Sequence, residues 1–394
     1  MYAIINTKLI LADGIEFNGA LTFKDGKILD LGPADRVQIP ADATLIDAQG
    51  KYTAPGFIDI HNHGGPDQPF KAPDADVEAI CGFFLRHGQT TVLPTLYCDQ
   101  TVEEYLHTRD LVVAASGKGA GRIIGGMYIE GPYMSGYGSC QKDIRWTGEI
   151  LREEYMPLVE GMKGIMKIWA VDPARPGIVE FMKDVKAVDP EAIFATGHSQ
   201  ARFSQVAAVR KYGIKVQTHY NDSGKAPGFA QGTMGSGSDE CTLHEPEMYA
   251  ELICDQVGVH VDPDLIKMLL KIKGPDRVIL ITDHSARSGD FTNNEADGIA
   301  YGPDLNYDYE GHLSGSHLTM DNAIRNLMRH TGYGLCHAIR MATLNPAKLL
   351  GIDDQVGSLE VGKKANLVIM DDAVNVDTVI LEGQIAVKQG ELMV

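Results

Sequence analysis

The chain has 394 residues, with 35 basic and 53 acidic side chains and a formal net charge of −18. So acidic a protein is not attracted to nucleic acid or to an anionic membrane surface, and we expect neither as its main partner. No run of about 20 apolar residues occurs, and Met1–Lys8 lacks the pattern of a secretory signal. The six cysteines show no paired spacing, which predicts reduced thiols in a cytoplasmic protein.

Short alternating apolar runs, broken by turns, occupy both ends of the chain. Among the first fifty residues, the pair Asp25-Gly26 between two such runs predicts a β-hairpin. The last forty residues contain similar runs at 365–370 and 378–387. From fold precedent we expect one small β-sandwich module made from both termini, residues 1–53 plus 355–394. The pattern alone would also allow two separate modules.

Between these ends, apolar runs bounded by Gly or Pro alternate with longer segments of helical periodicity, which is typical of a parallel α/β sheet. Eight such runs follow one another: 56–61, 91–96, 124–130, 164–171, 192–198, 214–219, 250–254 and 277–283. A doubly wound sheet would also fit. Eight consecutive strand-then-helix units favour a closed (β/α)₈ TIM barrel, which we expect over residues 54–354.

Histidines and carboxylates stand where five of these runs end. They are His61 and His63, Glu130, His198, His219, and Asp283 with its neighbour His284. The C-terminal ends of barrel strands meet at one mouth, so we expect these side chains to converge there. Each residue taken singly would be an ordinary polar residue, and only their joint position at strand ends indicates a site. For His284 a supporting role and a purely structural one fit equally well.

The residue types at these ends suit a metal centre. Imidazole nitrogen and carboxylate oxygen are ligands for zinc, iron and manganese. His61 and His63 lie two apart on a strand, so their side chains point to the same face. We therefore predict one or two divalent ions, zinc in first place and iron or manganese as alternatives. Such an ion lowers the pKa of bound water to about 7, and a nearby carboxylate can accept the water's proton and pass it to a leaving amine. Asp283 suits that role.

At these positions the chain resembles the amidohydrolase superfamily and, within it, the N-acetylglucosamine-6-phosphate deacetylases. The resemblance covers nearly the whole chain, and its Glu-Gly-Pro and Ser-Gly-Ser-His-Leu-Thr-Met stretches are specific to the deacetylase branch. The stretches that carry it are Pro55–Gly64, Ile129–Pro132, Thr196–Ser199, Thr218-His219, Ile281–Asp283, Leu313–Met320, Met341–Gly351 and Gly357–Val368.

The resemblance implies a metal position at Glu130, His198 and His219 and, as in some members, a second one at His61 and His63. It implies hydrolysis of N-acetylglucosamine-6-phosphate to glucosamine-6-phosphate and acetate. In this reaction metal-bound hydroxide attacks the amide carbonyl, and Asp283 acts as general acid and base. A homodimer is also implied.

Substrate-binding residues are implied as well. Gln141 falls where the family places a His or Gln near the acetamide, although an ordinary loop amide fits this position nearly as well, and His260 matches a substrate-contacting histidine. The loop after the sixth run departs from the family, because it lacks the Arg that a neighbouring subunit offers to the phosphate. Asn221 and Lys225 are the candidates there, and Lys225 would supply only a point charge. A related amidohydrolase that acts on a different N-acyl amino sugar, without a 6-phosphate requirement, therefore stays open.

Overall fold

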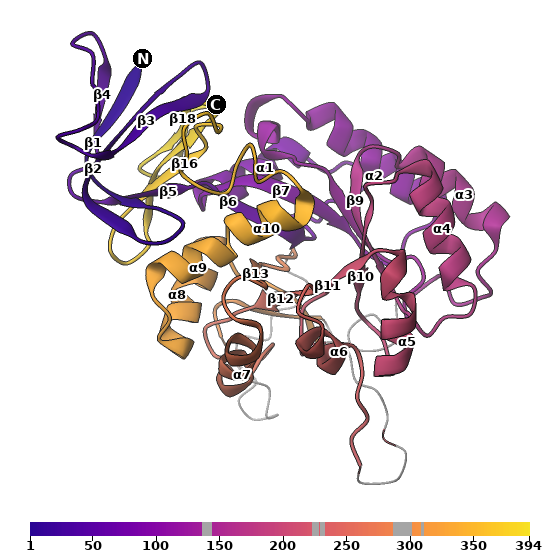
Figure 1. Ribbon diagram of the computed structural model, residues 1–394. Coiled ribbons are helices and arrows are strands. Elements are labelled where there is room, and N and C mark those ends of the chain that lie inside the picture. Colours follow the sequence, from indigo (N-terminus) through magenta and orange to yellow (C-terminus); the bar gives the residue numbers. More distant parts are fainter. Residues whose placement is uncertain (136–143, 223–227, 229–232, 287–301, 309–310) are drawn as a thin grey trace.

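The structure is a computed structural model that describes residues 1–135, 144–222, 228, 233–286, 302–308 and 311–394. Its centre is a sheet of eight parallel strands that follow one another in chain order (Figure 1). They are β6 (Phe57–Asn62), β7 (Gln89–Leu96), β8 (Met127–Glu130), β9 (Met166–Val171), β10 (Ile193–Thr196), β11 (Ile214–Gln217), β12 (Tyr249–Ile253) and β13 (Val278–Ile281). Most of their residues are buried, as expected for parallel strands covered on both faces.

The eight strands close into a barrel between the first and the last. Asn62, at the end of β6, forms a parallel bridge with His284, just beyond β13. The amide of Asp283 donates to the carbonyl of His61 at 2.9 Å, and the amide of His63 donates to that of His284 at 2.7 Å. These bonds confirm the predicted barrel, and they place the end of β13 beside the end of β6.

Helices surround the barrel in Figure 1. Local signals begin several of them: Asp76 caps α1 through the amide of Ala79 at 2.9 Å, and Thr101 and Glu104 form a capping box at α2. The helices are α1 (Val77–Arg86), α2 (Val102–Ala115), α3 (Arg152–Gly161), α4 (Ile178–Val188), α5 (Phe203–Val209), α6 (Ser238–His244), α7 (Pro263–Lys273), α8 (Met320–Thr331), α9 (Leu335–Met341) and α10 (Leu344–Leu350). The loop after β13 contains the short strands β14 (Leu305–Tyr307) and β15 (Leu313–Ser316).

Strands from both termini form a second, separate sheet of nine strands. Its centre is β5, which pairs with β1 on one side and with β16 on the other and so joins the two ends of the chain. The strands are β1 (Tyr2–Ile10), β2 (Ile15–Lys24), β3 (Lys27–Pro33), β4 (Thr44–Asp47), β5 (Tyr52–Pro55), β16 (Leu367–Met370), β17 (Val376–Leu381), β18 (Gln384–Lys388) and β19 (Glu391–Leu392). The predicted module from both termini is confirmed, and its strands are connected in one sheet.

The predicted hairpin of this sheet is also confirmed. Asp25 and Gly26 join β2 to β3 with φ angles of 50° and 77°, the left-handed pair that a two-residue hairpin turn requires. Residues of both chain ends then share one small core, which includes Ile4, Phe23 and Leu367. We propose residues 1–53 and 355–394 as one domain and 54–354 as the other, with β5 crossing between them.

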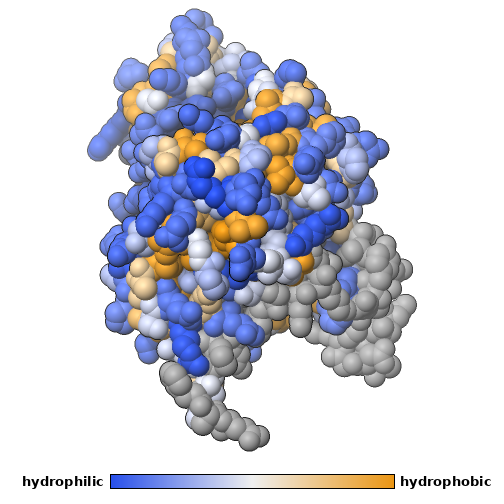
Figure 2. Space-filling model, turned by 90° about the vertical axis from the view of Figure 1, so that its right-hand side faces the viewer, coloured by the Kyte–Doolittle hydropathy of each residue, from blue (hydrophilic) through white to orange (hydrophobic). Residues whose placement is uncertain are grey.

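One face of the surface is mostly hydrophilic (Figure 2). Figure 2 shows one face on which hydrophilic residues surround several separate hydrophobic patches. Among the described residues, no helix combines the length and the apolar character that crossing a membrane requires.

Candidate metal centre

The predicted site residues stand at the C-terminal rim of the barrel. His61 is the second-last residue of β6 and Glu130 is the last residue of β8. His198, His219 and Asp283 each follow the end of a strand by two residues. Those last three residues have φ angles of 42°, 24° and 48°, in the left-handed region that costs energy for any residue with a Cβ. Such strained turns are typical of functional sites, because they direct a side chain where regular backbone would not.

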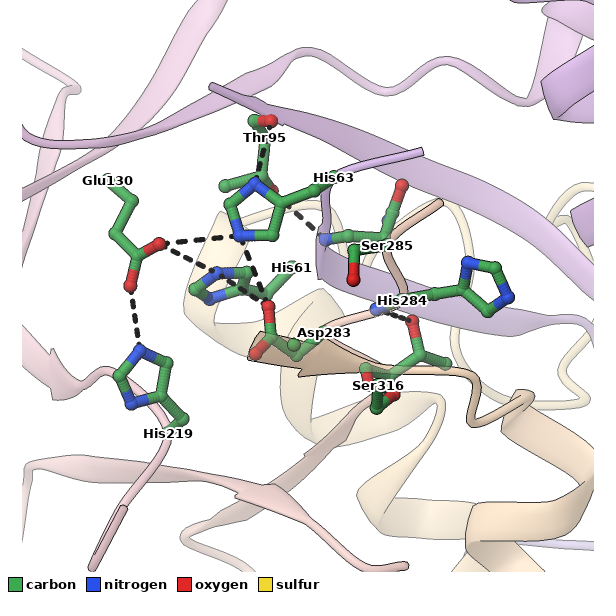
Figure 3. A network of polar contacts seen from close by, with 12 residues as sticks. His61, His63, Thr95, Glu130, His219, Asp283, His284, Ser285 and Ser316 are labelled. Carbon is green, nitrogen blue, oxygen red and sulfur yellow. Dashed lines mark hydrogen bonds and ion pairs between the residues drawn. The ribbon is translucent and has the colours of Figure 1, made fainter. Parts of the chain in front are cut away.

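Glu130 lies at the centre of four imidazoles. Its Oε1 is 2.8 Å from Nε2 of His198 and 2.7 Å from Nε2 of His219. Its Oε2 is 3.3 Å from Nε2 of His63 and 3.8 Å from Nε2 of His61 (Figure 3). Ligands about 2.1 Å from one tetrahedral ion lie about 3.4 Å from each other, so these separations are of the size that a metal site requires.

Two groups of side chains could therefore hold a metal ion, and both contain Glu130. One group joins it to His61 and His63, and the other joins it to His198 and His219. Four of these five side chains are almost completely buried, and His63 retains a side-chain exposure of 15%. The carboxylate is thus placed to bridge two positions.

Asp283 approaches the same space from β13. Its Oδ1 lies 3.2 Å from Nε2 of His63 and 3.5 Å from Nε2 of His61 (Figure 3). Burial raises the pKa of the Asp283 carboxyl, but the hydrogen bond to His63 and the charges of the nearby histidines outweigh burial and leave the pKa below its usual value. Burial likewise raises the pKa of Glu130, and His198 with its neighbours holds it well below the usual value. Two ionised carboxylates therefore face the centre at neutral pH.

The orientation of His61 shows that the centre fits a divalent ion. Its Nδ1 lies 3.0 Å from Oε2 of Glu251, and because an ionised carboxylate can only accept, Nδ1 carries the proton. Its buried Nε2 has no hydrogen-bond partner and faces oxygens of Glu130 and Asp283. Carboxylate oxygens that face imidazole nitrogens need positive charge between them, which a protonated ring supplies without metal and a divalent ion supplies for several of them at once.

Three supporting groups were not anticipated from the sequence. Glu251 holds His61, the carbonyl of Thr95 lies 3.2 Å from Nδ1 of His63, and Asp59 accepts from the hydroxyl of Thr282 at 2.7 Å. Asp59 and Glu251 are acids inside otherwise apolar strands, and that contrast was the available signal. The carbonyl of Thr95 left no signal at all, because any residue type supplies one.

Two of the four candidate substrate residues, His260 and Asn221, belong to the described part of the chain. His260 is buried in the loop after β12, with Nδ1 3.1 Å from Asp255 and Nε2 3.2 Å from the carbonyl of Gly315. Burial lowers the pKa of His260, but Asp255 outweighs burial and raises it to about 9. Asn221, two residues beyond His219, is partly buried, and its amide donates to Asp239 at 3.3 Å. The remaining two candidates, Gln141 and Lys225, lie outside the described residues.

His284 has a structural role, which decides between the two roles left open for it. Its ring points away from Glu130 (Figure 3), packs against Phe83 and Phe84, and has Nδ1 2.8 Å from the carbonyl of Gly64. Burial lowers its pKa to about 4, so the ring is neutral at physiological pH. It belongs to neither ligand group.

Known proteins of similar sequence align along the whole chain. The N-acetylgalactosamine-6-phosphate deacetylase of Escherichia coli O157:H7 is 28% identical over 386 residues, which is 96% of this chain and 97% of that protein. The N-acetylglucosamine-6-phosphate deacetylase of Bacillus subtilis strain 168 is 26% identical over 396 residues, which is 94% of this chain and 93% of that protein.

Solved structures share the fold. The N-acetylglucosamine-6-phosphate deacetylase of Pasteurella multocida superposes with a TM-score of 0.81 at 25% identity, covering 98% of this chain and 99% of that one. A mutant of the Mycobacterium smegmatis N-acetyl-D-glucosamine-6-phosphate deacetylase, in complex with N-acetyl-D-glucosamine-6-phosphate, has the same fold with a TM-score of 0.80 at 23% identity, covering 98% of each chain. The model of the Amidohydrolase family matches residues 52–386. The chain therefore belongs to the Amidohydrolase family.

Proposed function

We propose that the protein is a metal-dependent deacetylase that hydrolyses N-acetylglucosamine-6-phosphate to glucosamine-6-phosphate and acetate. One carboxylate at the barrel mouth approaches four imidazoles within 2.7–3.8 Å, with a second carboxylate beside it, and this arrangement carries the proposal. The names of the relatives, deacetylases of amino-sugar phosphates, support the substrate class. His61, His63, Glu130, His198 and His219 are the ligands that we propose.

Zinc is the ion that we propose for these ligands, in one or two positions, with iron or manganese as alternatives. When bound there, the ion lowers the pKa of a water ligand to about 7 and polarises an amide carbonyl. Glu130 would supply an anionic oxygen to both positions, and the four imidazoles would supply the remaining protein ligands.

Asp283 is the group that we propose to move the proton. Its Oδ1 lies within 3.5 Å of Nε2 of both His61 and His63, so it borders the space where water would attack. It accepts the proton of the attacking water as the oxygen bonds to the acetyl carbon, and then donates it to the nitrogen as the carbon–nitrogen bond breaks. Acetate and the free amine are the products. A carboxylate that is ionised before the reaction is a base ready for this step.

His260 is the proposed substrate contact with the best-defined position. Asp255 keeps it cationic and oriented, and its Nε2 lies against the backbone of Gly315. The amide of Ser316, the next residue, donates to the carbonyl of Asp283 at 2.8 Å, so His260 is connected to the catalytic centre through one strand. We propose Asn221, Gln141 and Lys225 as further substrate contacts, with Lys225 at the phosphate.

The second candidate substrate is a different N-acetyl amino sugar, for which the galactosamine isomer is the specific case. The Escherichia coli relative acts, by its name, on N-acetylgalactosamine-6-phosphate. The two sugars differ in the configuration of one ring hydroxyl, and the reacting acetamide is the same in both. The metal centre would therefore treat them alike, and discrimination would come from residues around it.

Acetate release from four sugars tests both candidates. The zinc-loaded enzyme is assayed with N-acetylglucosamine and N-acetylgalactosamine, each with and without the 6-phosphate, and Asp283→Asn serves as the inactive control. We expect the highest kcat/KM for N-acetylglucosamine-6-phosphate. Higher turnover of the galactose isomer would assign the second candidate, equal turnover without phosphate would remove the phosphate requirement, and no acetate from any sugar would overturn the proposal.

Lys225→Ala gives a separate test of the phosphate contact. A lost point charge should raise KM for the phosphorylated sugar and leave KM for the unphosphorylated sugar unchanged. An identical change for both sugars would remove Lys225 from the phosphate site.

We further propose a homodimer in the cytoplasm. Every described cysteine carries a free thiol, which suits a reducing compartment. Light scattering coupled to size-exclusion chromatography measures the mass directly: about twice 42.8 kDa supports the dimer, and a single 42.8 kDa species contradicts it.

A further inference from the structure

Glu251 is a charged residue in the middle of the apolar strand β12, and it is 0% exposed. Its Oε2 lies 3.0 Å from Nδ1 of His61 and accepts from the amide of His219 at 3.3 Å. Within the part of the chain that the structure describes, the one ion-pair partner of this carboxylate is His61. Moving a carboxylate from water into a protein interior costs several kcal/mol, so a specific contact must compensate for it.

The contact with Glu251 determines which nitrogen of His61 faces the centre. With Nδ1 donating to Glu251, Nε2 is the nitrogen that points at Oε2 of Glu130 and Oδ1 of Asp283, and it is the one that would bind a metal ion. The ring of His61 also lies 4.7 Å from that of Tyr128, which limits its rotation. The orientation and the tautomer of this one ligand are therefore set from behind by a strand two places away in the barrel.

His63 provides the comparison inside the same group. Its Nδ1 faces a neutral acceptor, the carbonyl of Thr95, at 3.2 Å. A carboxylate partner makes an imidazole a stronger electron donor than a neutral carbonyl does, because negative charge behind the ring stabilises positive charge in front of it. His61 is thus the more strongly supported ligand of the two.

We propose that Glu251 is a positioning residue for His61 and that it determines the affinity of one of the two metal positions. This position is the one formed by His61, His63 and Glu130, and the inference rests on the metal centre of the proposed function. Glu251 contacts the other position, at Glu130, His198 and His219, only through the backbone amide of His219. Glutamine can keep that contact, so this position should keep its affinity. Glu251 would set how many ions the protein holds at a given free zinc concentration.

Zinc titration of Glu251→Gln tests the proposal without any assay of activity. Glutamine has the same shape and can still accept from the amide of His219, but it has no charge. We expect zinc binding about 10–100-fold weaker at one position and unchanged at the other, measured against a chelator of known affinity. Wild-type affinity at every bound ion would overturn the proposal, and so would an equal loss at both positions.

A thermodynamic cycle with His61→Asn tests whether Glu251 acts through His61. Once that ring is absent, adding Glu251→Gln should weaken zinc binding by no more than about twofold, the usual error of additivity. The same 10–100-fold loss in that background would overturn the proposal. Should Glu251→Gln fail to fold, Glu251→Asp repeats the test, because it keeps the charge but withdraws it from Nδ1.

Asp321→Asn is the matched control. Asp321 is also a buried carboxylate that faces Nδ1 of a histidine, His87, at 3.1 Å, but His87 belongs to neither ligand group. This variant should keep wild-type zinc affinity, so a loss in Glu251→Gln alone cannot be a general effect of removing a buried acid. An enzyme that binds zinc as expected but releases no acetate would refute the proposed function and leave this inference standing, whereas unchanged zinc binding would do the reverse.

Discussion

Replacing Glu130 by glutamine tests whether one carboxylate serves both metal positions. Its Oε1 lies 2.8 Å and 2.7 Å from Nε2 of His198 and His219, and its Oε2 lies 3.3 Å from Nε2 of His63. An amide has the same shape, but one of its two ends is an NH₂ group, which cannot bind a cation. One position therefore loses its oxygen ligand whichever way the amide is turned, and the other keeps a neutral oxygen in place of an anionic one.

The size of the effect follows from the contacts of Glu130. Loss of a supporting group that only orients a ligand typically costs 10–100-fold in metal affinity. Loss of the ligand oxygen itself should cost at least about 100-fold at one position, or about 2.8 kcal/mol. The other position, which keeps its number of ligands, should weaken less. Glu130→Gln thus affects both positions, whereas Glu251→Gln affects one.

The assay is zinc content by elemental analysis after dialysis at buffered free zinc, together with competitive titration. Circular dichroism establishes that the variant is folded, and Asp321→Asn again serves as the control. We expect Glu130→Gln to hold at most one ion at a free zinc concentration that fills both positions of the wild type. Two ions bound with wild-type affinity would refute the ligand role of Glu130 and the shared-carboxylate centre with it.

Three further variants test separate parts of the account. Asp283→Asn should lower kcat by about 10²–10⁴-fold while zinc content stays unchanged, and retained turnover would refute its role in proton transfer. Gly197→Ala should destabilise the protein by about 1–3 kcal/mol, because the new Cβ would lie 2.6 Å from Cβ of Thr218. Thermal unfolding measures this loss against Gly334→Ala, whose Cβ meets nothing within 4 Å, and equal melting temperatures would contradict it. Burial raises the pKa of Asp321, but the contact with His87 outweighs burial and brings the pKa to about 2. This is below the value of about 3.9 in the unfolded chain. Ionised Asp321 therefore adds about 2–3 kcal/mol to the free energy of unfolding above pH 4. This contribution is lost as the pH falls toward 2. Urea unfolding of Asp321→Asn should show less loss of stability between pH 5 and pH 3 than the wild type does, and identical losses would contradict the contribution.

The barrel and the ligand set could be predicted because both follow a local pattern. Each ligand stands at or just beyond the end of an apolar run, and parallel strands in a barrel must end at one rim. His61, Glu130 and His219 could therefore be grouped from their places in the runs alone. The pairing of β5 with β16 joins residues more than 300 positions apart, and no local pattern specifies it. Fold precedent supplied that expectation.

The support behind the ligands could not be predicted in this way. Glu251 is two strands away from His61 in the sheet, so their contact exists only once the barrel has closed. The partner of His63 is a backbone carbonyl. Because every residue type has one, the sequence does not indicate this contact. His284 follows Asp283 directly, and sequence left its role undecided, because the direction of its side chain depends on the left-handed turn at Asp283. Supporting contacts of this kind form only when the barrel closes. The ligands, in contrast, can be predicted from their positions at the ends of strands.

Zinc-edge anomalous diffraction from crystals grown with zinc tests the central claim most directly. The account predicts two peaks about 3.5–4 Å apart at the barrel mouth. One should lie about 2.1 Å from Nε2 of His198 and His219, the other about 2.1 Å from Nε2 of His61 and His63, with Glu130 between them. Zinc bound elsewhere, with these imidazoles free of metal, would contradict it.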